Sequence, residues 1–332
     1  MGSLFVGPYR QNNINGLYSK TILQNIINSI PESKFLICRN LFVDPIIINE
    51  FDDQSIKKHE NITIDSKINT LIQHVPPNAI YLSQYLDHNI CIPILDNRIL
   101  TDEQLYRLSL CTKVLTDSYL IYTQLKDYLS NIYFFQYDPI ITREPIESKI
   151  NLGAYHNTNK FYFMGTLQHN KDLLLDLMLS FGIFSQTHDN TSLVLLMFDA
   201  NKKETDSIQN IVNSIYKQLN VNNVFVKIIY NSIPNKLETI IEYHQYCDVL
   251  LNINDNTRNS LQANYARVFG SNIINDYDLK YEKSIMRNDI INSNGFLTPT
   301  QNSILEALQN FTSGSLNTHN ISPDSIGKFI WN

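Results

Sequence analysis

The sequence predicts an α/β protein made of two Rossmann-like, doubly wound domains that face each other across a cleft. Short apolar segments alternate with segments of helical periodicity along most of the chain, which is the pattern of parallel sheets covered by helices on both faces. This alternation stops between residues 139 and 158 and then restarts. The length of 332 residues also suits two domains better than one core.

The first domain is expected to cover residues 1–145. Apolar runs predict its strands, and apolar residues at helical spacing predict its helices. Thr101 is the expected N-cap of the second helix, because its side chain can accept a hydrogen bond from the first turn. The expected strands lie at 4–8, 34–43, 70–75, 89–95, 113–116 and 132–135, and the expected helices at 18–30, 102–110 and 118–129.

The second domain is expected to cover residues 159–312, after a linker at 146–158 with prolines close before it and a glycine within it. A tail at 313–332 follows, and its lone tryptophan, Trp331, is expected to dock on the first domain. The expected strands are 161–164, 192–198, 224–229, 248–253 and 272–274, and the expected helices are 171–181, 204–219, 235–246, 259–269 and 302–311.

Composition excludes several classes of protein. With 43% hydrophobic and 17% charged residues the chain is globular, and a net charge of −6 argues against a general nucleic-acid binder. The apolar runs are too short to span a membrane, and the first residues predict a strand and a loop rather than a signal peptide. The cysteines lie in separate apolar runs, which predicts buried free thiols and a reducing cytoplasm: Cys38, Cys91, Cys111 and Cys247.

No metal and no other cofactor is expected. Histidines and cysteines are scattered without the spacing of a zinc site. Asp276-Tyr277-Asp278 has the spacing of a metal-binding Asp-x-Asp motif. It follows the wrong strand for that role, so a chance occurrence in a loop is the favoured interpretation. A lysine and helix N-termini are able to neutralise a phosphate without a metal ion.

The stretch from Phe161 to Met178 contains a candidate anion site. An apolar run reaches Gly165, and a short polar loop then leads into a helix whose first turn contains Lys171. The N-terminus of a helix attracts anions through its free N–H groups and its dipole. A lysine gains nothing from that field, so its presence indicates a bound phosphate. An ordinary strand–helix unit with a solvated lysine is the alternative interpretation.

From Leu4 to about Ile274, the order of segments resembles the GT-B glycosyltransferases, particularly the group-1, or family 4-like, retaining enzymes that use nucleotide sugars. Asn15-Gly16 resembles the family's glycine-containing loop, which approaches the donor phosphates. Gln73-His74-Val75-Pro76 resembles the segment whose imidazole contacts the transferred sugar. Met164-Gly165-Thr166, followed by Lys171, resembles the loop whose lysine pairs with the diphosphate. Three further similar segments are Val114 to Ser118, Tyr246 to Leu251 and Gly270 to Ile274.

The sequence also departs from the family's pattern. Thr166 stands where the family has an arginine, and Thr257 and Tyr265 stand at the positions of its two paired glutamates. Arg258 and Ser260 occupy positions where the family's loop has glycines, and Arg258 is a candidate for the missing cation. These departures put both the donor contacts and the activity in question.

The resemblance implies transfer of a sugar from a nucleotide-diphosphate sugar, such as a UDP-sugar, with retention and without a metal. The acceptor stays open between a glycan, a protein, a lipid and a nucleic-acid base. His74 and Lys171 are the expected catalytic residues. The expected donor-binding residues are Gly16, Gly165, Thr166, Asn231, Ser232, Arg258, Asn259, Ser260, Leu261 and Tyr265.

Several alternatives stay open at this point. A degenerate GT-B protein that only binds or scaffolds would explain the missing glutamates, and a sugar-nucleotide epimerase has the same two-domain arrangement. At single positions, His74 is also compatible with a packed residue, Gly16 with an ordinary Asn-Gly turn, and Tyr265 with an aromatic residue in the core.

Overall fold

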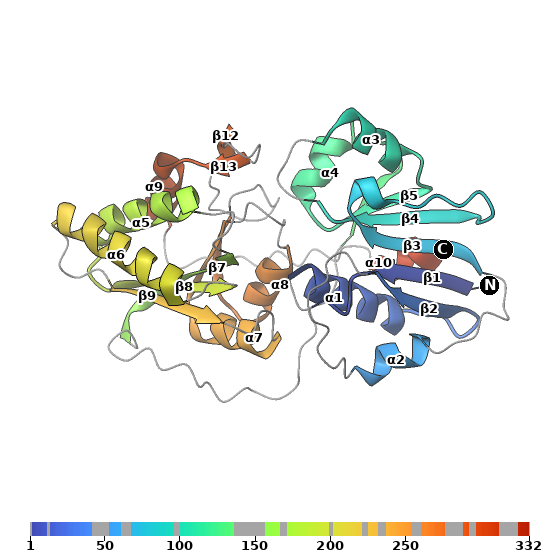
Figure 1. Ribbon diagram of the computed structural model, residues 1–332, viewed down its shortest axis with the longest axis horizontal. Helices are drawn as coiled ribbons and strands as arrows, with labels where there is room; N and C mark the ends of the chain where they lie inside the picture. The colour runs from blue at the N-terminus through green and yellow to red at the C-terminus, as the bar shows by residue number, and fades with distance from the viewer. Residues whose placement is uncertain are drawn as a thin grey trace. The chain divides into compact units, whose positions relative to one another are not determined.

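The chain folds into two compact units (Figure 1). The first unit contains the described residues up to Phe135 together with 325–331, and the second contains those from 157 to 311. The computed structural model describes residues 2–11, 14–41, 53–60, 68–95, 100–135, 157–166, 171–198, 202–220, 225–231, 237–253, 260–275, 288–291, 297–311 and 325–331.

The first unit is built on a six-stranded parallel sheet with the order β2-β1-β3-β4-β5-β6. The chain passes from β1 to β2 on one side and then places β3 on the other side of β1, so the order reverses between β1 and β3. Ligands of open parallel sheets bind at the carboxyl edge of such a reversal. The strands are β1 (Gly2–Gly7), β2 (Phe35–Asn40), β3 (Ile68–Val75), β4 (His88–Pro93), β5 (Lys113–Thr116) and β6 (Ile132–Phe134).

Helices cover both faces of this sheet, with α3 (Asp102–Ser109) and α4 (Tyr119–Leu125) on one side and α1 (Ile14–Asn28) on the other (Figure 1). Successive strand residues point to opposite faces. Val75 therefore packs into the core beneath α3 and α4, whereas His74 points to the opposite face and meets Tyr18 of α1. A short helix, α2 (Gln54–Glu60), packs beside β2.

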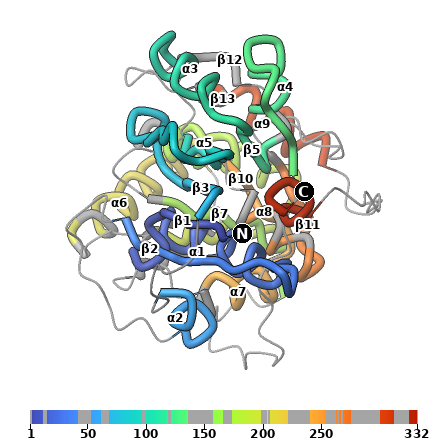
Figure 2. The backbone as a smooth tube through the Cα atoms, turned by 90° about the vertical axis from the view of Figure 1, so that its right-hand side faces the viewer, coloured from blue at the N-terminus to red at the C-terminus, as the bar shows by residue number. Residues whose placement is uncertain are grey.

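The end of the chain also belongs to the first unit. Helix α10 (Ile326–Trp331) packs on α1 (Figures 1 and 2). The indole Nε1 of Trp331 donates a hydrogen bond to Ser29 Oγ at 3.1 Å, and Lys113 Nζ donates one to the carbonyl oxygen of Phe329 at 2.6 Å. The sequence predicts a tail here whose Trp331 docks on the first domain, and the structure places this tryptophan in the first unit, at the end of a helix of six residues that was not predicted.

The second unit is built on a five-stranded parallel sheet with the order β11-β10-β7-β8-β9, which reverses between β7 and β10. The strands are β7 (Asn159–Thr166), β8 (Thr191–Phe198), β9 (Phe225–Asn231), β10 (Val249–Asn252) and β11 (Asn272–Asn275). A small antiparallel pair follows them, made by β12 (Asn288–Ile291) and β13 (Leu297–Pro299).

The core of the second unit lies on one face of its sheet, beneath α5 (Lys171–Ser185), α6 (Lys202–Gln218) and α9 (Gln301–Gln309). Ser180 Oγ also donates a hydrogen bond to the carbonyl oxygen of Gln301 at 2.9 Å, which fixes α9 on α5. Helices α7 (Leu237–Tyr246) and α8 (Ser260–Val268) cover the other face (Figure 1).

The predicted strands and helices all occur, with most ends within two or three residues of the prediction. Helix α1 begins at Ile14, four residues earlier than predicted, and Thr101 caps α3 as expected. Helices α2 and α10 and the β12–β13 pair were not predicted, because they are short and carry little periodic pattern. The predicted linker at 146–158 lies outside the described residues except for its last two positions.

The four cysteines are all buried and unpaired, which confirms the expectation of free thiols. Within the described ranges, no helix combines the length and the apolar character needed to cross a membrane. The same ranges contain no group of three or more histidine, cysteine, aspartate or glutamate side chains that would hold a metal ion.

Candidate functional site

The reversal point of the first sheet brings together the end of β1, the end of β3 and the first turns of α1. Val6 pairs with Gln73 in the parallel register, so Gly7 and His74 are neighbours at this edge. A Cβ at Gly7 would lie 2.7 Å from Ser19 Oγ. The glycine therefore allows α1 to approach the strand closely, on the face that also carries His74.

This edge contains a cluster of buried polar atoms whose hydrogen-bonding capacity is not met. Asn15 Oδ1, Ser19 Oγ and both ring nitrogens of His74 have no hydrogen-bond partner among the described residues. Leaving one such atom buried and unpaired costs roughly 1–3 kcal/mol. Buried polar groups are normally paired, so these atoms on adjacent elements indicate a place for a polar ligand group.

His74 is fully buried, and burial lowers its pKa to about 3. The imidazole is therefore neutral near pH 7, and one ring nitrogen donates a hydrogen bond while the other accepts one. Tyr18 of α1 packs against the ring, which agrees with the alternative that His74 is a packed residue. A neutral ring that both donates and accepts suits a hydroxyl group.

Gly16 lies inside α1 rather than in the loop before it. A Cβ at this position would lie 2.0 Å from the carbonyl oxygen of Gln11, which is a backbone atom and would shift only at a cost in stability. Glycine is thus required for the chain to turn from the end of β1 onto the helix. Gly16 therefore lies close to the loop that precedes α1 rather than to a ligand. It allows the loop and the helix to meet at the edge where the unpaired polar atoms lie.

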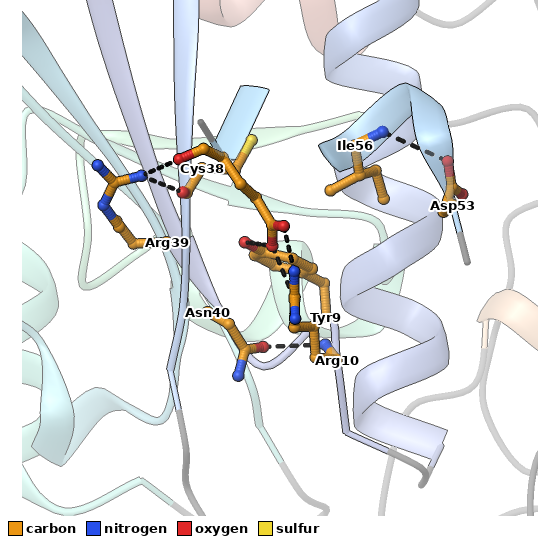
Figure 3. Close-up of polar contacts among 8 residues, drawn as sticks. Tyr9, Arg10, Cys38, Arg39, Asn40, Asp53 and Ile56 are labelled. Atoms are coloured by element: carbon orange, nitrogen blue, oxygen red, sulfur yellow. Dashed lines mark hydrogen bonds and ion pairs between the residues drawn. The ribbon is translucent and has the colours of Figure 1, made fainter. Parts of the chain in front are cut away.

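A second polar group at this edge is centred on Glu60, the last residue of α2. Figure 3 shows Tyr9, Arg10, Arg39 and Asn40, which take part in it. Its Oε1 accepts hydrogen bonds from Tyr9 Oη and Arg10 Nε, both at 2.7 Å, and its Oε2 pairs with Arg10 Nη2. Arg39 donates to the carbonyl oxygen of Glu60 at 2.8 Å, and Asn40 Oδ1 accepts from the backbone N–H of Arg10 at 2.9 Å. These contacts fix the loop after β1 to β2 and α2.

Tyr9 is buried, and its burial and the Glu60 carboxylate raise the pKa of its hydroxyl. The tyrosine is therefore a hydrogen-bond donor to Glu60 at any ordinary pH. Sequence reasoning missed this group, because Glu60 lies fifty residues from Arg10 and in a helix that was not predicted. The signal that the sequence does contain is the Tyr-Arg pair directly after an apolar strand.

The reversal point of the second sheet brings together the ends of β7 and β10. Gly165 and Thr166 end β7, and Asn252 ends β10. A Cβ at Gly165 would lie 2.5 Å from the ring of Phe163, so this glycine makes room for a core aromatic residue. The neighbouring side chain of Thr166 lies outside the described part of the structure.

Two helices begin after these strands. Lys171 is the first residue of α5, and Ser260 and Leu261 are the first two of α8. Helix N-termini that follow the carboxyl ends of parallel strands favour phosphate through their N–H groups and dipoles. The side chains of these three residues lie outside the described part.

Of the other predicted donor-binding residues, Asn231 ends β9, which β8 separates from β7. Ser232, Arg258 and Asn259 lie outside the described residues. Thr257 and the Asp-x-Asp at 276–278 lie outside them as well.

Tyr265 lies in the interior of the second unit with no exposed surface. Its ring stacks with His244 at a centroid distance of 6.2 Å and with Phe269 at 6.5 Å. His244 Nδ1 forms a 2.6 Å hydrogen bond with Tyr162 Oη, and burial lowers the His244 pKa to about 3. This position agrees with the alternative that Tyr265 is a core aromatic residue.

Both units are thus parallel sheets covered by helices, each with one reversal of strand order. Two such Rossmann-like domains define a GT-B glycosyltransferase-like fold. The Staphylococcus aureus MnaA–UDP co-structure is similar at a TM-score of 0.51 and 8% identity, covering 93% of this chain and 86% of that one. A lysine-to-methionine mutant of the Thermobaculum terrenum O-GlcNAc transferase is similar at 0.52 and 10%, covering 93% and 59%.

A UDP-GlcNAc 2-epimerase from Neisseria meningitidis, bound to UDP-GlcNAc, has a TM-score of 0.48 and 11% identity, covering 93% of this chain and 91% of that one. No protein-family model matches the chain, and no curated protein matches it. At identities this low, the likeness to solved structures establishes the fold.

Proposed function

We propose that this protein is a glycosyltransferase that moves a sugar from a nucleotide-diphosphate sugar to an acceptor, with retention and without a metal ion. The observation that carries this proposal is the cluster of unpaired buried polar atoms on Asn15, Ser19 and His74. It lies at the carboxyl edge of the strand-order reversal, where ligands of such sheets bind. A sugar presents several hydroxyl groups, which both donate and accept hydrogen bonds.

In this proposal, His74 binds a hydroxyl group of the transferred sugar. Its neutral ring offers one donor and one acceptor, and Ser19 Oγ and Asn15 Oδ1 complete the set. A ligand that met these atoms would recover the energy that their burial costs. Gly16 supports the set by allowing the loop and α1 to come together.

The diphosphate is assigned to the second unit. Lys171 and the backbone N–H groups at the start of α5 and α8 would neutralise the charge that develops on the leaving group. The proposed donor contacts are Gly165, Thr166, Asn231, Ser232, Arg258, Asn259, Ser260, Leu261 and Tyr265. Of these, Tyr265 is buried in the core.

Two further observations support the proposal. The MnaA structure with this fold contains UDP, and the Thermobaculum terrenum protein is described as an O-GlcNAc transferase. A UDP-sugar is accordingly the first donor to test. The four buried, unpaired cysteines support a cytoplasmic location, because a reducing compartment keeps thiols free.

Donor binding tests the proposal directly. A panel of UDP-, GDP- and ADP-sugars should raise the melting temperature of the protein, and at least one of them should do so at millimolar concentration. Lys171→Ala should lose the part of the melting-temperature shift that the diphosphate causes. UDP without a sugar measures that part. Lys203→Ala, an exposed lysine on α6, is the matched control and should keep it. Absence of any shift across the panel would refute donor binding.

A binding protein without catalysis is the second candidate. The position of Tyr265 favours it, because this residue stands at the position of one of the family's paired glutamates and is buried in the core. Product analysis separates the candidates: a transferase forms a glycosylated acceptor or hydrolyses the donor slowly, and a binding protein leaves the donor intact. An epimerase would convert the free sugar nucleotide with no acceptor present.

A further inference from the structure

The loop between β3 and β4, residues 76–87, exposes large apolar side chains in an unusual concentration. Tyr81 is 66% exposed, Leu82 37% and Tyr85 85%. Single exposed apolar residues are common on protein surfaces. Three exposed ones within five residues of one loop bring apolar area close together along the chain, and concentrated exposed apolar area marks binding surfaces.

Two side-chain amides hold this loop in place. Gln73, buried in β3, donates from Nε2 to the carbonyl oxygen of Tyr81 and accepts from the Tyr81 N–H, both at 2.8 Å. Asn89 of β4 forms the same pair of bonds with the backbone of Ser83, both at 3.1 Å. Ile80 is anchored in the core below α3. The exposed side chains therefore project from a fixed backbone, which lowers the entropy lost on binding.

The loop leads away from the carboxyl edge of the sheet. It leaves β3 one residue after His74 and turns back over the face opposite to it. Gln73 lies level with Cys91 in the register, and Asn89 lies level with Leu71, so the two attachment points differ by two strand positions, or about 7 Å. A ligand that followed the loop would be extended, with one end at the edge that contains His74.

The chemistry of the loop selects the kind of ligand. Asp87 is the one charged residue in the sequence from Pro76 to Asp87, so the segment offers no cation to a phosphate or to a nucleic-acid backbone. The two most exposed side chains are tyrosines, which combine a flat apolar face with a hydroxyl group. A sugar ring has the matching combination of a C–H face and a hydroxyl rim.

We propose that Tyr81 and Tyr85 form a binding surface for a neutral glycan of two or more sugars, which serves as the acceptor. This inference rests on the proposed glycosyltransferase function for the role of the glycan. The binding itself requires no nucleotide, so it is measurable separately.

The test measures binding of maltohexaose, cellohexaose and chitohexaose to the full chain by affinity electrophoresis and saturation-transfer NMR, without donor. At least one should bind, and Tyr81→Ala and Tyr85→Ala should each weaken it by roughly threefold to tenfold. Tyr128→Ala, which removes a tyrosine 72% exposed in the same unit, is the matched control and should bind normally. Unchanged urea midpoints would show that all three variants fold.

Three outcomes would overturn the inference. They are no binding of any of the three oligosaccharides, binding by the Tyr81 and Tyr85 variants that is as tight as that of the parent protein, and a concentration-dependent dimer that both variants abolish. The last would assign the patch to a second copy of the chain. If glycans bind but no nucleotide sugar does, the proposed function fails and the glycan surface stands. If donors bind and no glycan does, the glycan surface fails and the proposed function stands.

Discussion

The ring of Tyr18 lies edge-on against the ring of His74, with 4.9 Å between their centroids and an angle of 81° between their planes. This contact joins α1 to the end of β3 and helps to enclose the imidazole, which has no exposed surface. An edge-to-face contact holds a ring without using its polar atoms. Both nitrogens of His74 thus have no hydrogen-bond partner among the described residues, at a cost in stability.

Replacing His74 with an apolar residue should remove this cost and stabilise the protein. We expect His74→Leu to raise the free energy of unfolding by roughly 1–2 kcal/mol, because it removes two buried, unpaired nitrogens and keeps an apolar side chain. The same variant should lose sugar transfer. Urea unfolding and a transfer assay measure the two effects.

His244→Leu is the comparison for that variant. It removes the 2.6 Å hydrogen bond to Tyr162 together with one unpaired nitrogen, Nε2, so it should gain less than His74→Leu and lower stability by at most about 1 kcal/mol. Destabilisation of similar size in both histidine variants would contradict the assignment of His74 as a residue kept for ligand binding.

The two buried histidines also predict an acid-sensitive stability. Burial lowers the pKa of both His74 and His244 to about 3, from about 6.5 in an unfolded chain. Below pH 6.5 the unfolded chain binds a proton on each histidine and the folded protein does not. The stability that the two neutral histidines allow is therefore fully present above pH 6.5 and is lost as the pH falls toward 3. Each should lower stability by about 1.4 kcal/mol per pH unit well below 6.5.

Urea midpoints between pH 7.5 and 5 measure this loss. His74→Leu should remove the contribution of the first unit, and His244→Leu that of the second. Stability that stays constant over this range in the parent protein would contradict the prediction.

The glycine of α1 gives a structural test. Gly16→Ala should destabilise the first unit by roughly 1–3 kcal/mol, because its Cβ would lie 2.0 Å from the carbonyl oxygen of Gln11. It should also weaken any ligand binding that uses Asn15, which precedes it. Urea unfolding and the donor thermal shift measure both effects.

Gly270→Ala is a matched glycine control. Gly270 has a φ of 80° and no atom within 4 Å of a Cβ, so its cost should be backbone strain of about 1 kcal/mol. It lies in the second unit, after α8. An effect of Gly16→Ala no larger than that of Gly270→Ala would show that the loop moves aside easily.

Most of the fold could be predicted from the sequence, for physical reasons that particular elements make clear. Strands such as β8 are buried on both faces and therefore carry a continuous apolar run, here from Leu193 to Met197. Helix α3 has a complete capping box between Thr101 and Gln104, which determines where it begins. By contrast, α2 is seven residues long and buries one apolar side chain, Ile56, so it has no periodic signal.

The candidate site could be predicted only in part. His74 stands out by its place at a strand end, but its burial depends on Tyr18 of another element, which no local pattern reveals. Arg10 and Glu60 find each other through the packing of α2 beside β2. Tyr265 is the opposite case. The sequence predicts it as a donor-binding residue, and its stacking with His244, which no local pattern reveals, places it in the core.

The Arg10–Glu60 pair should stabilise the loop after β1. Glu60→Gln keeps the shape of the side chain and removes its charge, so the hydrogen bonds to Arg10 should weaken and stability should fall by roughly 1–3 kcal/mol. A double-mutant cycle with Arg10→Met isolates the coupling between the two side chains. A coupling free energy near zero would mean that Tyr9 and Asn40 fix the loop without the ion pair.

The last helix should stabilise the first unit alone. Trp331 is 8% exposed, bonds Ser29 through its indole nitrogen, and lies beneath Lys34, whose Nζ is 5.7 Å from the ring centroid. We expect Trp331→Ala to destabilise by about 3 kcal/mol and Trp331→Phe by less, since phenylalanine keeps most of the apolar contact. Amide hydrogen exchange should become faster in α1 and stay unchanged in α5 of the second unit. Faster exchange in both helices would mean that the two units unfold together, and that α10 stabilises the whole chain.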